Sequence, residues 1–100
     1  MKYTTPKLLE RMLEAHLRCA GFKDATAAKG THYVSEAGVP CLRVSLFKWP
    51  QTAMTWELLT GYERVLAQLP GVVRTEIVHD CQGINLRDQV IVIHRRMWED

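Results

Sequence analysis

The chain has 100 residues, of which 47% are hydrophobic and 24% are charged, and its formal net charge at pH 7 is +2. This length suits one domain with a single core, and the composition is that of a folded globule rather than a disordered segment. No apolar run approaches the ~20 residues that span a membrane, and a net charge this small does not by itself indicate a nucleic-acid partner. The N-terminal residues lack the apolar stretch of a signal peptide, so we expect a single cytoplasmic domain over residues 1–100.

The three cysteines are Cys19, Cys41 and Cys81. An odd count at wide spacings argues against a disulfide framework and agrees with a reducing compartment. We expect Cys19, in a helix, and Cys41, at the start of a strand, to be small buried apolar residues.

The first predicted element is a helix between Thr5 and Gly21. Thr5 is a favourable N-cap, and Pro6 suits the first helical position, where its missing N–H costs nothing. Gly21 supplies the left-handed stop, and Phe22 is placed to fold back on Leu17. The helix carries one apolar stripe, formed by Leu9, Met12, Leu13, Leu17 and Ala20.

On the opposite side of this helix, Glu14 and Arg18 are four residues apart, in the favourable order for an ion pair. Residues 23–30 are small and polar, and we interpret them as a mobile loop. A short strand at 31–35 and a turn at 36–38 follow.

Residues 41–49 alternate as a strand. Leu42, Val44 and Leu46 point one way, toward the core. Arg43, Ser45 and Phe47 point the other way, and Trp49 joins Phe47 on this less buried face before Pro50 ends the strand.

A second helix is predicted from about Thr52 to Leu69. Gly61 in its middle costs roughly 1 kcal/mol relative to alanine, which indicates close approach to another backbone. Pro70 and Gly71 end it. Its stripe consists of Leu58, Tyr62, Val65, Leu66 and Leu69, flanked by Trp56 and Leu59.

The remaining sequence predicts a hairpin of strands 72–79 and 85–97 around a turn at 80–83. The last strand contains Val90–Ile93, the most apolar run in the chain. A strand that is apolar on both faces is typical of the centre of a sheet.

The order αββαββ predicts an α+β two-layer sandwich, in which a four-stranded, mainly antiparallel sheet has both helices on one face. The same order results from moving the first strand of a ferredoxin-like βαββαβ chain to its end. The architecture is therefore similar to a circularly permuted ferredoxin-like fold, with the last strand beside strand 41–49 in the middle. Only one face of Val90–Ile93 then lies under helices, so we expect its other face to be covered from outside the domain.

No catalytic or metal site is predicted. His79, Asp80 and Cys81 combine three catalytic residue types, but adjacent strand residues point to opposite faces and turn chemistry explains Asp80. His16 and Cys19 on the first helix, with His79 and Cys81, are possible metal ligands that lack the paired spacing of a structural zinc site. We expect a non-enzymatic protein without a cofactor.

A nucleic-acid interface is one alternative for the sheet face, because aromatic residues beside basic ones stack and hold RNA on open sheets. The residues that suggest it are His94, Arg95, Arg96, Arg43, Lys48, Arg74 and Arg87, interleaved with Phe47, Trp49 and Trp98. Four acids dilute this charge: Glu76, Asp88, Glu99 and Asp100.

A protein interface on the same open face is the preferred hypothesis, because exposed aromatic and apolar groups beside arginine are typical of binding hot spots. The residues expected to contact a partner are Arg43, Phe47, Trp49, Arg95, Arg96 and Trp98. The partner is another protein or a second copy of the chain, giving a homodimer through the sheet face. Short single-domain chains without catalytic motifs are frequent among phage and mobile-element accessory proteins, including inhibitors of host defence. We therefore expect an accessory or inhibitor protein of this class, which would act in the host cytoplasm. A structural protein resembling phage tail-completion proteins is a further alternative.

Overall fold

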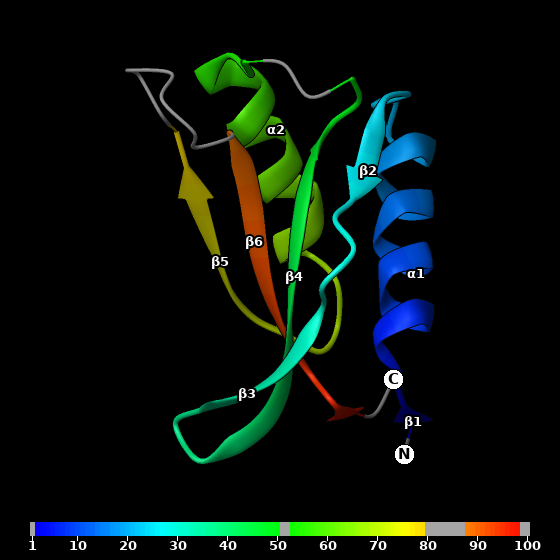
Figure 1. Ribbon diagram of the computed structural model, residues 1–100, viewed down its shortest axis with the longest axis vertical. Helices are drawn as coiled ribbons and strands as arrows, with labels where there is room; N and C mark the ends of the chain where they lie inside the picture. The colour runs from blue at the N-terminus through cyan, green and yellow to red at the C-terminus, as the bar shows by residue number, and fades with distance from the viewer. Residues whose placement is uncertain (1, 51–52, 80–87, 99–100) are drawn as a thin grey trace.

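The computed structural model describes residues 2–50, 53–79 and 88–98. Two helices and seven strands occur in this part of the chain (Figure 1). In chain order they are β1 Lys2–Tyr3, α1 Pro6–Cys19, β2 Ala25–Ala27, β3 His32–Glu36, β4 Val39–Lys48, α2 Trp56–Ala67, β5 Val72–Val78, β6 Gln89–Arg95 and β7 Met97–Trp98.

The main sheet has the strand order β2-β4-β6-β5, and β3 pairs with β4 on the same side as β2. All of these pairs are antiparallel. The fold is thus α+β with an open five-stranded sheet, and the prediction that the last long strand and strand 41–49 lie side by side in the middle is confirmed. The prediction of four strands is wrong, because β2 was not expected.

Helix α1 forms as its terminal residues predict. The Thr5 hydroxyl accepts a hydrogen bond from the Leu8 N–H at 3.3 Å. At the other end, Gly21 has φ of +104°, and the Phe22 N–H donates to the Leu17 carbonyl at 3.0 Å. This left-handed ending turns Phe22 back toward the core.

Strand β2 lies where a mobile loop was expected, and α1 explains why. The carboxylate of Glu14 accepts a hydrogen bond from the Ala27 N–H at 2.8 Å, and Arg18 Nε donates to the Ala25 carbonyl at 3.1 Å. The expected ion pair between Glu14 and Arg18 is therefore replaced by two bonds to the β2 backbone. Ala25 and Ala27 are buried against α1, so this edge of the sheet is held by the helix.

Helix α2 begins at Trp56, four residues later than predicted, with Thr55 as its N-cap, and Thr52 lies outside the described residues. Leu59, Tyr62 and Leu66 are its buried residues. The close approach at Gly61 is to a side chain rather than to a backbone, because a Cβ added there would lie 3.0 Å from Cζ of Phe22.

The main core lies between the helices and one face of the sheet. On β4 it contains Leu42, Val44 and Leu46, as the alternation predicts, and on β6 it contains Val90 and Val92. Both helices contribute buried leucines to this one cluster, which confirms that they cover the same face.

The opposite face of the sheet carries a second, smaller cluster of Cys41, Ile91 and Ile93. Ile91 is 3% exposed and Ile93 is 2% exposed. Val34 of β3 and Val78 of β5 pack against them from the two sides. The expectation that this pair must be covered from outside the domain is therefore wrong, because the chain already buries both side chains.

The last predicted strand, 85–97, divides into two in the structure. β6 ends at Arg95, Arg96 is a bend, and β7 then pairs antiparallel with β1. The predicted turn at 80–83 and residues 85–87 lie outside the described residues. The short β1–β7 ribbon therefore brings the first and last described segments together at one end of the sheet (Figure 1).

Candidate protein interface around Arg96

The residues predicted to contact a partner lie at two separate ends of the sheet. Phe47 and Trp49 are at the end of β4, whereas Arg95 and Arg96 are beside its start, because β6 runs antiparallel to β4. The ten residues of β4 span roughly 30 Å. Phe47 is only 8% exposed, so of this aromatic pair Trp49, at 60%, is the accessible member.

The other two residues predicted to contact a partner are Arg43 and Trp98. Arg43 is half-buried in mid-strand, opposite Ile93 in the register. Trp98 belongs to β7, where its backbone pairs with Lys2. The predicted residues therefore do not form one surface, and the end that contains Arg96 gathers several exposed apolar side chains around a cation.

Arg96 is held by its backbone at the junction between the main sheet and the β1–β7 ribbon. Its N–H donates to the Pro40 carbonyl at 3.0 Å, and its carbonyl accepts from the Thr4 N–H at 2.9 Å. The N-terminal segment and the start of β4 are thus joined through one residue. These two hydrogen bonds fix the backbone position from which the Arg96 side chain extends.

The Arg96 guanidinium lies between two tyrosine rings. Its Cζ is 4.7 Å from the ring centroid of Tyr3 and 4.5 Å from that of Tyr33. Contacts of this kind are worth about 0.5–1 kcal/mol each at exposed sites, so the pair restrains the arginine plane. Both rings are themselves about half exposed, at 51% and 54%.

A hollow of about 310 Å³ opens beside this arginine, and we call it the Arg96 hollow. It is lined by Tyr3, Val39, Pro40, Arg96 and Met97. Met97 is 52% exposed and Val39 is 37% exposed, so the lining is accessible and mainly apolar around one cation. This combination of aromatic, arginine and methionine side chains is enriched in protein interfaces.

The charge of Arg96 is not neutralised within the described part of the chain. Its Nε is buried and has no hydrogen-bond partner there, and no carboxylate among those residues lies within ion-pair distance of its guanidinium. Arg74 differs, because its Nε donates to Glu36 Oε1 at 2.6 Å and its Nη1 lies 3.5 Å from Glu76 Oε2. Among the described residues, Arg96 is therefore a cation without a carboxylate partner at the edge of an apolar surface.

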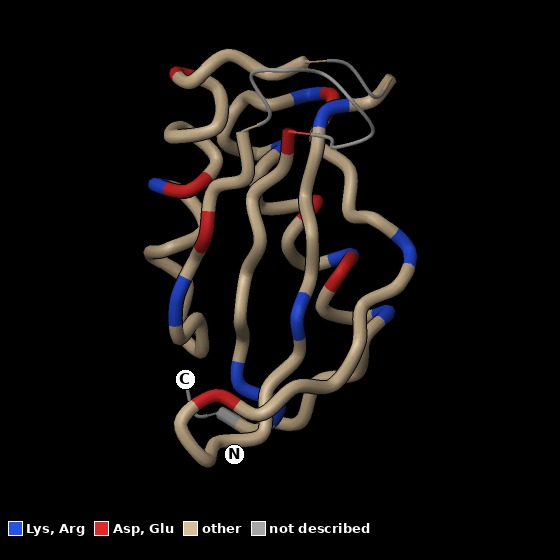
Figure 2. Tube along the Cα trace, turned by 60° about the vertical axis from the view of Figure 1, so that its left-hand side comes forward, with Lys and Arg blue, Asp and Glu red and all other residues tan. Residues whose placement is uncertain are grey.

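Several of the basic residues that suggested nucleic-acid binding are buried or paired in the structure. His94 is fully buried, and burial lowers its pKa, which disfavours the charged form. Arg74 is paired with two glutamates, and Arg87 lies outside the described residues. Figure 2 shows basic and acidic positions interspersed along the sheet rather than a continuous basic stripe.

His79 contacts an acid that the sequence pattern did not associate with it. Its Nδ1 lies 3.2 Å from one carboxylate oxygen of the buried Asp88, whose other oxygen accepts from the Met54 N–H at 2.7 Å. Trp56 stacks obliquely near the imidazole, with ring centroids 6.0 Å apart. This group joins the segment before α2 to the start of β6. Cys81, which was considered with His79 as a reactive or metal-binding residue and not predicted as one, lies outside the described residues.

The other candidate ligands are dispersed. His16 and Cys19 are exposed on α1, which corrects the expectation that Cys19 is buried, whereas Cys41 is buried as expected. Burial, with a smaller effect of the Glu36 charge, raises the pKa of the Cys41 thiol. Within residues 2–50, 53–79 and 88–98, no three His, Cys, Asp or Glu side chains are grouped so as to hold a metal ion.

Comparisons of the chain with protein-family models, with curated proteins and with solved structures find no match. Neither described helix has the length and apolar character needed to cross a membrane.

Proposed function

We propose that this chain is a non-enzymatic protein-binding module, and that its partner places an acidic side chain flanked by apolar residues in the Arg96 hollow. The observation that carries the proposal is the Arg96 guanidinium between the half-exposed rings of Tyr3 and Tyr33, without a carboxylate partner among the described residues. A carboxylate from the partner would supply a counter-ion, and the apolar flanks would cover Val39 and Met97.

Charge complementarity favours an acidic partner for a physical reason. A guanidinium that is already held in plane by two rings loses little conformational freedom when its N–H groups meet a carboxylate. Hydrogen bonds to a charged group contribute about 1.5–3 kcal/mol, which corresponds to about tenfold to a hundredfold in affinity. The exposed rings and Met97 would add apolar area at low entropic cost.

The expected location differs from the centre of the open sheet face. Ile91 and Ile93 are buried within the chain, so a partner would gain little by covering them. The end of the sheet around Arg96 retains the exposed apolar side chains that an interface uses.

The proposal is tested with synthetic peptides that carry one Asp or Glu between apolar residues, each paired with the same peptide containing Asn or Gln. Binding is measured by fluorescence anisotropy at 150 mM salt. We expect acidic peptides to bind, the amide peptides to bind at least about tenfold more weakly, and Arg96→Ala to abolish the difference. Arg95→Ala is the matched control, because Arg95 is an exposed neighbour with the same charge.

Tyr33→Ser removes one stacking ring without changing any charge, and it should weaken acidic peptides severalfold while circular dichroism confirms an intact fold. Equal binding of acidic and amide peptides, or equal losses in Arg95→Ala and Arg96→Ala, would contradict the proposal. Tight binding of a labelled single-stranded RNA that falls steeply between 50 and 200 mM salt would favour the nucleic-acid alternative instead. A mass of two chains by light scattering, lost in Arg96→Ala, would assign the surface to a homodimer.

A further inference from the structure

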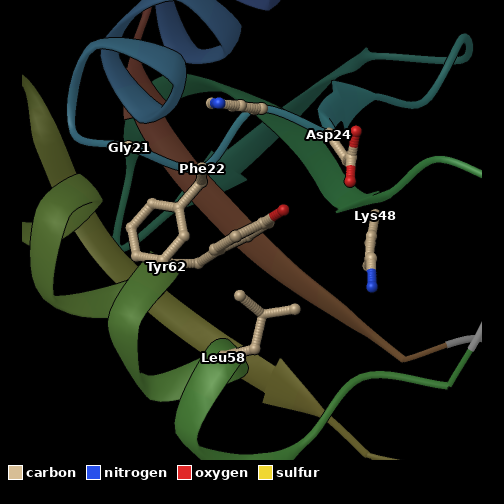
Figure 3. A pocket seen from close by; sticks show the side chains of 7 residues that line it. Gly21, Phe22, Asp24, Lys48, Leu58 and Tyr62 are labelled. Carbon is tan, nitrogen blue, oxygen red and sulfur yellow. The ribbon is translucent and has the colours of Figure 1, made fainter.

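A second hollow lies at the other end of β4, where the C-terminal turn of α1 meets α2 (Figure 3). Its volume is about 270 Å³, close to the lower end of the range for small-molecule sites. We call it the Tyr62 pocket. It is lined by Gly21, Phe22, Lys23, Asp24, Lys48, Leu58 and Tyr62.

The apolar side of the pocket is built by two aromatic rings and a leucine. Phe22 and Tyr62 meet edge to face with centroids 4.9 Å apart and an interplanar angle of 64°. Phe22 reaches this position because α1 ends in a left-handed turn and because Gly61 has no Cβ to block its ring. Leu58, half-buried on α2, completes this wall.

The Tyr62 hydroxyl is a polar group without a hydrogen-bond partner in the described part of the chain. The residue is only 1% exposed, and its hydroxyl makes no hydrogen bond to any residue that the structure describes. In Figure 3 the oxygen points away from α2, toward the side of the pocket that holds Asp24 and Lys48. Burial, with a smaller effect of the Asp24 charge, raises the pKa of Tyr62 to about 12, so the hydroxyl is a hydrogen-bond donor at neutral pH.

Opposite charges flank that hydroxyl without pairing with each other. Asp24 precedes β2, and Lys48 ends β4 directly opposite Ala25 in the register. The backbone of Asp24 is fixed, because its carbonyl accepts from the Trp49 N–H at 2.8 Å and from the Thr26 hydroxyl at 3.2 Å. Neither Asp24 nor Lys48 forms an ion pair with a residue in the described ranges.

We propose that the Tyr62 pocket binds a free α-amino acid with an apolar side chain. The ligand carboxylate pairs with Lys48 and accepts a hydrogen bond from the Tyr62 hydroxyl. The ligand ammonium group faces Asp24, and its side chain packs on Leu58 and Phe22. The lining carries two cations, Lys23 and Lys48, and one anion, Asp24. A zwitterion is favoured over a simple anion because only the zwitterion has an ammonium group to pair with Asp24.

This site is independent of the proposed protein interface, because β4 separates it from the Arg96 hollow by roughly 30 Å. Failure of one proposal leaves the other unaffected, since no residue lines both sites.

The experiment is a titration of the ¹⁵N-labelled full chain with leucine and phenylalanine, followed by amide chemical shifts. Two analogues of leucine test its two charged groups one at a time. 4-Methylpentanoate lacks the ammonium group, and 3-methylbutylamine lacks the carboxylate. We expect saturable shifts at the amides of Phe22, Lys48 and Leu58 with leucine or phenylalanine, and at least about tenfold weaker binding of both analogues.

Tyr62→Phe keeps the buried ring and removes only the hydroxyl, so it should weaken leucine binding about tenfold without unfolding the chain. Lys48→Met should have a similar effect, whereas Lys29→Met, an exposed lysine outside the pocket, should have none. The proposal is overturned if the amides near the pocket do not shift at 20 mM amino acid. It is also overturned if 4-methylpentanoate binds as tightly as leucine, or if Tyr62→Phe binds leucine unchanged.

Discussion

The substitution Ile93→Ala tests whether the second cluster is complete within one chain. Ile93 is 2% exposed, and it lies between Arg43 of β4 and Arg74 of β5 in the register. Truncation removes three buried carbon atoms, which at about 0.8 kcal/mol each gives about 2.4 kcal/mol. The cavity left behind adds to this, so the free energy of unfolding should fall by about 2–5 kcal/mol.

The assay is urea unfolding at two protein concentrations a hundredfold apart. With a slope of roughly 1–3 kcal/mol per molar urea, a loss of this size lowers the midpoint by about 0.7–5 M. The midpoint of the wild-type chain should not depend on protein concentration, because no second copy is needed to bury the side chain. Val73→Ala, on β5 and 41% exposed, is the matched β-branched control and should change the stability by less than about 0.5 kcal/mol.

Two outcomes would refute the reasoning. A small effect of Ile93→Ala would mean that the side chain is not packed as described. A wild-type midpoint that rises with protein concentration would mean that a second copy covers this face, which restores the sheet-to-sheet dimer as the better hypothesis.

Three further predictions concern the fold. Burial lowers the pKa of His94, so the unfolded chain binds a proton that the native chain does not once the pH falls below about 6.5. The free energy of unfolding should therefore decrease from that pH downward by up to about 1.4 kcal/mol per pH unit, and His94→Gln should flatten urea midpoints measured between pH 7.5 and 5. Glu14→Ala removes the acceptor of the Ala27 N–H, so hydrogen exchange of that amide should accelerate about tenfold, and Glu10→Ala should leave it unchanged. Thr5→Ala removes the N-cap of α1 and should cost about 1 kcal/mol in urea unfolding, most of which Thr5→Ser should restore.

Elements whose signals are local were predicted well. The termini of α1 follow from Thr5 and Gly21, and the alternation of Leu42, Val44 and Leu46 correctly assigns the core face of β4. Strand β2 was missed because Ala-Thr-Ala carries no strand pattern of its own. Its pairing depends on β4 and on two α1 side chains, so tertiary contacts decide it rather than propensity.

The second cluster was misjudged for a related reason. A period-two pattern tells which residues share a face, but it does not tell what the flanking strands place over that face. Val34 and Val78 come from β3 and β5, and neither stands out in the sequence as a cover for Ile91 and Ile93. His94 was also misassigned, since its place in a basic tripeptide suggested exposure, whereas its register opposite Leu42 places it on the core face.

The candidate interface was predicted only in part, because the fold assembles it from distant segments. Arg96 was selected from the sequence, but Tyr3 and Tyr33 are brought to it by the β1–β7 ribbon and by the β3–β4 hairpin. The hydrogen bond from the Thr4 N–H to the Arg96 carbonyl holds the neighbouring residue Tyr3 close to the arginine. Arg96 supplies the cation of the hollow and also holds the N-terminal segment through its carbonyl. If that hydrogen bond were lost, Tyr3 would move away from the arginine although every contact residue would still be present. Binding at Arg96 and docking of the N-terminal segment should therefore be energetically coupled, and a partner that binds there should stabilise β1 against local opening.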